Sequence, residues 1–504
     1  MKIPEIAKII SQKIFRININ NDIKEIGQVI KVSDGVATVY GLINVQFNEL
    51  VEFSNGVNGV VFNIEEDSIG IVILDNDFSV SSKFLVKRKN HSFLIPVSSK
   101  MLGRVINVFG NPVDNKGIIP DCFFQKVDLK APGIIERGKI NEPIQTGIKA
   151  IDSLIPIGKG QRELIIGNRK TGKTSIIIDT ILNQKLNNNR VNERNKIFCI
   201  YVAIGQKKSS IANVIKKLTN DNAIQYTIII ASSSSDPTPL QFYAPYVGCT
   251  IGEYFSNNGM DALIAYDDLS KHAIAYRQMS LLLRRSPGRE AYPGDIFYIH
   301  SRLLERSIKF SIENGSGSLT ALPVIETQES DVSAYVPTNV ISITDGQIFL
   351  ETDLFNQNIK PAINIGLSVS RIGSSAQINA MKKVSNTIKL YLSQFRELKS
   401  FSKFSSDLDV ETKNLLIKGE MLTNMLTQPL NKPLQVEEQV IIIFTIMNNY
   451  VKYVKIDDFY EFENNLLKNI KKDKLHILEF IRKKKYLNKL LLEELNIYLK
   501  NFFL

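Results

Sequence analysis

A glycine-rich segment at 167–174, GNRKTGKT, combines residue types that bind phosphate. It follows the apolar run Leu164-Ile165-Ile166 and precedes a helix-like segment that begins at Ser175. The glycines let backbone N–H groups face a polyphosphate, and the helix behind them adds the positive end of its dipole. The sequence therefore predicts a nucleotide phosphate-binding loop made of Gly167, Asn168, Arg169, Lys170, Thr171, Gly172, Lys173 and Thr174.

Two side chains of this loop and one carboxylate beyond it predict a magnesium–triphosphate site. Lys173 is expected to contact the terminal phosphates, and the hydroxyl of Thr174 to ligate magnesium. The apolar run 262–266 leads directly into Asp267 and Asp268, at the end of a predicted strand. Asp267 is expected to hold the magnesium through water, whereas a helix cap explains Asp268 equally well.

Hydrolysis also needs a group that activates water, and here the sequence offers an amide. The predicted strand 198–203 leads into Ile204-Gly205-Gln206. A glutamine amide can orient a water molecule by hydrogen bonds, but it cannot accept a proton. Some GTPases place water with glutamine, so the residue type by itself leaves both a hydrolytic and a non-hydrolytic site open.

Three patterns along the sequence indicate the elements that must position these groups. Short β-rich runs separated by glycines predict a small barrel over 25–92. Apolar runs alternating with amphipathic stretches predict a parallel α/β domain over 93–374, and helical spacing of Leu, Ile and Phe predicts a helical bundle over 375–504. Isoleucines at three- and four-residue intervals predict an N-terminal helix within 1–24, which needs a partner surface.

Composition limits the class of protein. The 504 residues are 44% hydrophobic and 22% charged, which is typical of a globular protein of about three domains. No apolar run approaches the roughly 18 residues of a membrane span, and three cysteines without paired spacing predict a reducing compartment. The 62 basic and 51 acidic residues give a net charge of +11. Solvated helix faces explain this excess better than a polyanion site, because no aromatic stacking pattern accompanies it.

Six further segments, taken together in this order, resemble the α subunits of the rotary proton-translocating ATP synthases. The resemblance covers roughly residues 1–450 and separates these subunits from their catalytic β relatives, which carry Glu where this sequence has Gln206. The segments are 34–42 (DGVATVYGL), 156–164 (PIGKGQREL), 266–271 (YDDLSK), 284–295 (RRSPGREAYPGD), 340–346 (VISITDG) and 361–371 (PAINIGLSVSR).

The resemblance implies a fold and a role. The fold is an N-terminal β-barrel, a central RecA-like nucleotide-binding domain and a C-terminal helical domain. The role is that of a regulatory subunit that holds magnesium with ATP or ADP without turning it over, consistent with Gln206. Arg371 is implied to act as an arginine finger that stabilises charge in the neighbouring subunit's catalytic site, and Ser342 to line the same interface.

The resemblance also implies how adenine is bound. Phe355, Lys360 and Gln428 match family positions that form the adenine pocket. Lys360 stands where the family has Arg, and Leu430 stands where it has a second Gln.

Partners follow from the resemblance as well. It implies a ring of three α and three β subunits around a γ central stalk, with δ and b forming the peripheral stalk. Membrane association is then indirect, through the proton-channel sector at the cytoplasmic face of a bacterial inner membrane or its organellar equivalent, and no nucleic acid is bound.

Three alternatives remain. A self-sufficient β-type ATPase requires Glu in place of Gln206. A hexameric RNA helicase with the same core is superficially favoured by the charge of +11, and it requires a stacking surface in the barrel. A stand-alone nucleotide-sensing scaffold would occur without a β-like partner.

Overall fold

The computed structural model describes residues 25–75, 80–191, 195–402, 410–451 and 459–503, which form two compact units. The helix predicted within 1–24 lies outside these residues. The first unit contains the described residues up to 94, together with 237–239 and 278–286. The second contains the other described residues.

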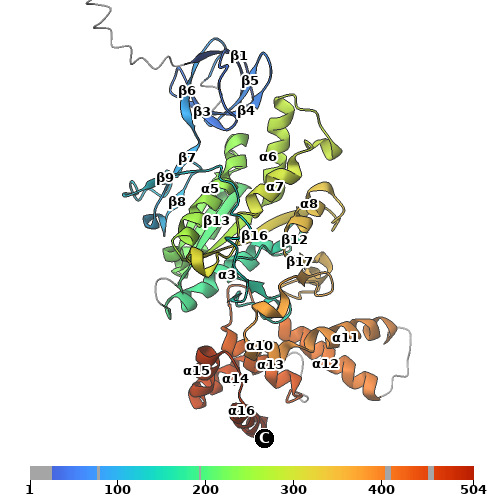
Figure 1. Cartoon of the computed structure of the whole chain (residues 1–504). Helices are drawn as coiled ribbons and strands as arrows, with labels where there is room; N and C mark the ends of the chain where they lie inside the picture. The colour runs from blue at the N-terminus through green and yellow to red at the C-terminus, as the bar shows by residue number, and fades with distance from the viewer. Residues whose placement is uncertain (1–24, 76–79, 192–194, 403–409, 452–458, 504) are drawn as a thin grey trace, which may run out of the picture. The chain divides into compact units, whose positions relative to one another are not determined.

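The first unit is built around a closed six-stranded antiparallel barrel, which confirms the predicted barrel (Figure 1). Alternate residues of the strands point inward, and the interior is filled by side chains such as Val39, Val51 and Ile71. Gly59 is required here because a Cβ would lie 2.6 Å from Ile71 Cγ2. In barrel order the strands are β1 (Ile26–Ser33), β2 (Val36–Tyr40), β5 (Ile69–Ile73), β4 (Asn58–Ile64), β3 (Glu49–Phe53) and β6 (Leu85–Ser92).

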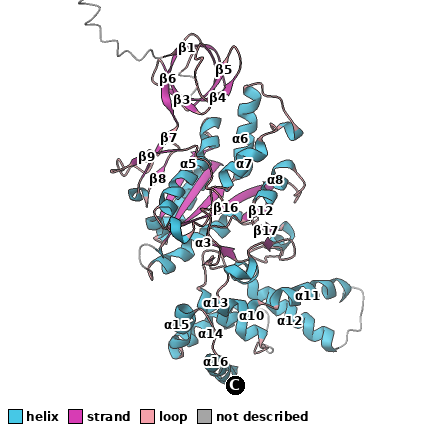
Figure 2. Cartoon of the chain, viewed as in Figure 1, coloured by secondary structure: helices cyan, strands magenta, loops and turns pink. Residues whose placement is uncertain are grey.

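The second unit contains an eight-stranded sheet enclosed by helices, as the alternating pattern predicted (Figure 2). Neighbouring strands are parallel, except for the antiparallel pair at the β18 edge. Parallel pairing brings the carboxyl ends of these strands to one edge, where ligands of α/β sheets bind. In sheet order the strands are β18 (Val369–Ser370), β17 (Gly346–Leu350), β12 (Leu164–Asn168), β16 (Ser318–Thr327), β15 (Asp261–Asp267), β13 (Ile197–Gln206), β14 (Thr227–Ser233) and β8 (Val105–Ile106).

The helices around this sheet and four short outlying strands complete the α/β part. Helix α3 buries Ile176, Ile177, Ile178 and Ile181 against the core, and full burial of such a side chain stabilises by about 1.5–3 kcal/mol. The elements are α2 (Lys149–Leu154), α3 (Lys173–Asn188), α4 (Lys208–Asn220), α5 (Thr238–Asn257), α6 (Leu269–Leu282), α7 (Ile296–Leu304), α8 (Tyr335–Ile343) and α9 (Thr352–Asn356), with β7 (Leu94–Val97) paired to β9 (Phe123–Lys126) and β10 (Pro143–Ile144) to β11 (Ile157–Gly158).

Helices follow the sheet to the end of the described residues, which confirms the predicted C-terminal helical region (Figure 1). Their apolar side chains join those of the sheet in one continuous core. Within the described residues, no helix combines the length and apolar character needed to cross a bilayer. The helices are α10 (Asn379–Ser385), α11 (Ile388–Ser402), α12 (Val410–Leu426), α13 (Val436–Met447), α14 (Phe459–Asp473), α15 (Leu475–Lys484) and α16 (Lys489–Phe503).

A buried ion pair joins the α/β part to these helices. Lys149 Nζ of α2 lies 2.7 Å from Glu463 Oε2 of α14, and the two side chains are 1% and 8% exposed. Burial lowers the pKa of Lys149 and raises the pKa of Glu463. Each group therefore depends on the other to remain charged.

We expect Lys149→Met to destabilise the folded protein by about 3–5 kcal/mol, because it leaves the Glu463 carboxylate buried without its cation. Urea unfolding followed by circular dichroism measures this loss. The matched control, Lys474→Met, breaks the more exposed pair with Glu494 and should cost less than about 1 kcal/mol. The double variant Lys149→Met/Glu463→Leu should recover most of the stability. Equal losses in Lys149→Met and the control would contradict this account.

Candidate functional site

The phosphate loop connects the end of β12 to the start of α3. Gly167 lies against β17, where a Cβ would be 2.5 Å from the carbonyl oxygen of Leu350. Lys170 and Gly172 have φ of 64° and 100°, which turns the backbone sharply into the helix. Asn168 attaches the loop to the start of α9, because its Nδ2 donates to Thr352 Oγ1 at 2.9 Å. The N-terminus of α3 is thereby directed at the space above the loop.

Lys173, the first residue of α3, extends its side chain back along the loop. Its Nζ donates to the carbonyl oxygens of Gly167, at 2.8 Å, and Asn168, at 2.5 Å. The side chain is buried, and burial lowers the pKa of Lys173, while nearby carboxylates, Glu326 foremost, oppose that shift. A cation in this place supplies the charge that phosphate oxygens need.

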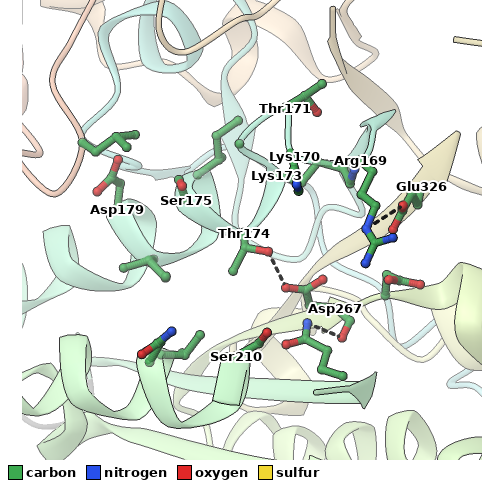
Figure 3. A pocket seen from close by; sticks show the side chains of 18 of the residues that line it. Arg169, Lys170, Thr171, Lys173, Thr174, Ser175, Asp179, Ser210, Asp267 and Glu326 are labelled. Carbon is green, nitrogen blue, oxygen red and sulfur yellow. Dashed lines mark hydrogen bonds and ion pairs between the residues drawn. The ribbon is translucent and has the colours of Figure 1, made fainter. Parts of the chain in front are cut away.

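Asp267, the last residue of β15, is hydrogen-bonded to residues of α3 and β13, and Figure 3 shows its bond with Thr174. Its Oδ2 accepts hydrogen bonds from Thr174 Oγ1 of α3, at 2.7 Å, and from the Tyr201 hydroxyl of β13, at 2.8 Å. Gln206 Nε2 donates to the Asp267 carbonyl oxygen at 3.0 Å and to the Tyr201 hydroxyl at 3.3 Å. A hydroxyl and a carboxylate converging beside a phosphate loop are the ligand types that magnesium prefers, so these residues fit that ion.

Asp268 takes the second of the two roles considered from the sequence. Its Oδ1 accepts the backbone N–H of Lys271 at 2.8 Å, and its Oδ2 lies 3.2 Å from Lys271 Nζ. The carboxylate therefore caps the start of α6. Burial raises the pKa of Asp268 to about 6, against the attraction of Lys271.

A cavity of about 650 Å³ opens above the loop. It gathers most of the residues that the sequence predicted to bind nucleotide. Glu326, at the end of β16, also lines it, and the Glu326 carboxylate lies 3.9 Å from Arg169 Nε (Figure 3). The predicted residues that line the cavity are Arg169, Lys170, Thr171, Gly172, Lys173, Thr174, Gln206, Asp267, Phe355, Lys360 and Gln428, and Leu430 lines it as well.

The side chains expected to contact adenine differ in their contacts within the protein. Lys360 Nζ lies 4.9 Å from the centre of the Phe355 ring, within cation–π range. The Gln428 side chain is hydrogen-bonded to backbone groups. Its Oε1 accepts the Lys149 N–H at 3.1 Å. Its Nε2 donates to the carbonyl oxygens of Gly147, at 2.8 Å, and Lys432, at 2.7 Å. Both donors of this amide are thus committed within the protein.

Four predicted site residues do not line the cavity. Gly167 packs against Leu350, and the Asn168 side chain donates to Thr352 Oγ1. Ser342 lies exposed on α8, and its hydroxyl donates to the carbonyl oxygen of Asn339. Arg371 directly follows β18, and its exposed guanidinium has no hydrogen bond or ion pair with any residue that the structure describes.

Three residues of the site escaped sequence reasoning: Glu326 and Asp179, which line the cavity, and Tyr201, which donates a hydrogen bond to Asp267. Tyr201 lies within the apolar run of β13, where an aromatic side chain is usually a core residue. Glu326 ends the apolar run of β16, and an acid at the end of a strand was the available signal. Asp179 directly follows three buried isoleucines on α3, so its signal in the sequence was only that of an acid next to an apolar run.

Comparison with known proteins agrees with this geometry. Family models match residues 22–90 as the beta-barrel domain and residues 147–370 as the nucleotide-binding domain of the ATP synthase alpha/beta family, and residues 377–502 as its C-terminal domain. The sequence is also 55% identical over 498 residues, 99% of its length and 97% of the other protein, to ATP synthase subunit alpha of Rickettsia canadensis (strain McKiel). These matches confirm the resemblance seen in the sequence segments.

We expect Lys173→Met to weaken ATP binding by about 10- to 100-fold, because it removes a buried charge-assisted donor at the phosphates. Equilibrium dialysis of the full-length protein with radiolabelled ATP and magnesium measures this change. Lys185→Ala is the matched control. Lys185 lies on the same helix, but it does not line the cavity. This variant should therefore bind ATP with the affinity of the wild type. Equal affinity in Lys173→Met and wild type would exclude this cavity as the phosphate site.

Proposed function

The chain belongs to the ATP synthase alpha/beta family, and we propose that it acts as the regulatory, non-catalytic alpha-type subunit of a rotary proton-translocating ATP synthase. In this role it binds ATP or ADP with magnesium in the cavity above the phosphate loop. It does not turn that nucleotide over. It supplies an arginine to the catalytic site of a neighbouring beta subunit during synthesis or hydrolysis coupled to proton transport.

In the proposed bound state, different groups of the protein hold the phosphates and the magnesium ion. Lys173 and the N–H groups of the loop would hold the phosphate oxygens, and Thr174 with Asp267 would hold magnesium. Magnesium would supply positive charge that offsets the negative charge of the phosphates. Tyr201 keeps the Asp267 carboxylate in one orientation through its 2.8 Å hydrogen bond.

The hydrogen bonds of the Gln206 amide are the main support for the proposal that this site does not hydrolyse its nucleotide. Its side-chain nitrogen donates to the Asp267 carbonyl oxygen and the Tyr201 hydroxyl, so the amide is held by the protein. An amide cannot accept the proton of an attacking water molecule. A water in this cavity would thus be neither oriented by the Gln206 donor nor deprotonated by this side chain.

The position of Arg371 supports its role as an arginine finger. Its backbone N–H donates to the Asp345 carbonyl oxygen at 2.8 Å, and the Asp345 carboxylate is held by Arg162 at 2.8 Å. The backbone is therefore fixed while the guanidinium remains exposed. A planar guanidinium reaching a neighbour's γ-phosphate stabilises charge there. Ser342, which is exposed on α8, is proposed to line the same interface.

The proposed partners follow from the alpha-type role. They are three beta subunits in a three-to-three ring, a gamma central stalk, and delta and b subunits in a peripheral stalk. The ring would associate with the cytoplasmic face of a bacterial inner membrane, or its organellar equivalent, through the proton-channel sector. No nucleic acid is part of this proposal, and salt-sensitive capture of RNA in filter binding would oppose it.

We expect Arg371→Ala to lower the turnover of the assembled complex by about 10³-fold or more, because the transition-state charge loses its finger. Steady-state hydrolysis by the purified complex measures this. Subunit assembly and nucleotide binding to the alpha-type subunit should stay intact. Arg371→Lys, which keeps the charge without the planar fork, should also remain strongly impaired. Unchanged turnover in Arg371→Ala would defeat the proposed role.

We expect Gln206→Glu to leave hydrolysis by the isolated protein at background. The introduced carboxylate loses the two donated hydrogen bonds and lies against the carbonyl oxygen of Asp267, and no facing arginine is supplied. A coupled-enzyme ATPase assay measures the rate, with ATP binding by the same variant as the folding control. Clear new hydrolysis would show that one missing carboxylate was the whole difference.

A further inference from the structure

The cavity extends beyond the phosphate loop to an end walled by apolar side chains. Ile148, Ile178, Phe355, Pro361 and Leu430 line the cavity along with the phosphate-binding residues. Hydrogen bonds join the segments that contain them: the Gln428 N–H donates to the Lys360 carbonyl oxygen at 2.7 Å, and the Asn431 N–H donates to Asp179 Oδ1 at 2.8 Å. An apolar chamber with a few polar groups is the usual setting for a nucleobase.

Asp179 lies at the opposite end of the cavity from Glu326, with Ser175 and Thr174 between them (Figure 3). It follows Thr174 by five residues on α3, a rise of about 7.5 Å along the helix. A nucleotide whose phosphates lie over the loop at Thr174 can therefore direct its base toward Asp179.

The hydrogen bonds at this end of the cavity leave one carboxylate oxygen of Asp179 available to a base. Gln428 has both amide donors committed to backbone carbonyls. Asp179 Oδ1 accepts the Asn431 N–H, whereas no residue in the described parts of the structure donates to its Oδ2. The residue is only 8% exposed and lines the cavity. The second oxygen is therefore left for a ligand in the cavity, and a ligand that donates to it gains a charge-assisted hydrogen bond.

We propose that Asp179 determines base specificity in this site, its free oxygen accepting a hydrogen bond from the exocyclic amine of a 6-aminopurine and repelling a 6-oxo group. The proposal rests on the nucleotide-binding function proposed above. In this proposal, the Asp179 carboxylate on α3 distinguishes a 6-amino from a 6-oxo purine. Gln428 instead holds the loop between α12 and α13 in place.

The protonation of Asp179 gives this proposal a second readout. Burial raises the pKa of Asp179 to about 6, opposed by the Asn431 N–H and by the charge of Lys217 on α4. Lys360 is the other cation that lines this end of the cavity beside Phe355. Above pH 6 the carboxylate repels a 6-oxo group. Below it, the protonated acid can donate to that oxygen, so discrimination should fall as the solution becomes more acidic.

The test compares the affinities of ATP and inosine triphosphate, which carries oxygen in place of the 6-amine. Dissociation constants are measured with magnesium on the full-length wild-type protein and on Asp179→Asn, at pH 7.5 and 5.5. We expect the wild type to prefer ATP by about 10- to 100-fold at pH 7.5 and by less at pH 5.5. Asp179→Asn keeps an acceptor for Asn431 and turns a donor toward the base, so its preference should fall to about 3-fold or less at both pH values.

Ser210→Ala is the matched control, because Ser210 lines the same cavity on α4 and should leave the preference unchanged. Titration of Asp268, at the phosphate end, affects both nucleotides alike and cancels in the ratio of affinities. An unchanged preference in Asp179→Asn, or an equal loss of both nucleotides, would overturn the proposal. Equal wild-type binding of both nucleotides, abolished by Lys173→Met, would overturn it while leaving the proposed function standing. Binding of neither nucleotide by the wild type would overturn both.

Discussion

The Asp267 carboxylate accepts hydrogen bonds from Thr174 and Tyr201, and this convergence sets the geometry of everything around the phosphate loop. It depends on parallel strand order, because β16 separates β12 from β15 and all three end at the same edge of the sheet. Thr174 is the second residue of α3, which follows β12, and Asp267 is the last residue of β15. A change in register by one residue would turn the Asp267 side chain to the other face and separate the pair.

The strand, turn and helix around the glycine-rich segment could be predicted from sequence because they depend on neighbours along the backbone. The barrel and the helical region were also predictable, from short β-rich runs and from helical periodicity. The sequence favoured Asp267 over Asp268 for magnesium, but the two acids are adjacent at the end of β15, and only the fold decides which one contacts Thr174. Tyr201 was missed for a similar reason, because the sheet order that places β13 beside β15 is not written in either strand. The helix expected within 1–24 stays a prediction.

Gln428 shows where a resemblance and a structure supply different information. The resemblance marks the position as part of the adenine pocket, and the residue does line the cavity. Its amide, however, is bonded to backbone groups of Gly147 and Lys149, which lie 281 and 279 residues earlier in the sequence. Sequence spacing cannot reveal such a bond. The side chain therefore shapes the pocket by holding a loop, which leaves the adjoining carboxylate of Asp179 to face a ligand.

The same hydrogen bonds make the base end of the cavity part of the junction with the helices. The backbone N–H of Lys149 donates to Gln428, and the Lys149 ammonium pairs with Glu463 of α14. Gly147 has φ of 77°, and a Cβ there would lie 2.5 Å from Pro433 Cβ, so the 428–434 loop packs directly on it. A base that displaces this loop must act on α2 and, through Lys149, on α14. Because these groups are tightly packed, the contacts that shape the base end of the cavity are the same ones that hold α2 against the helical region.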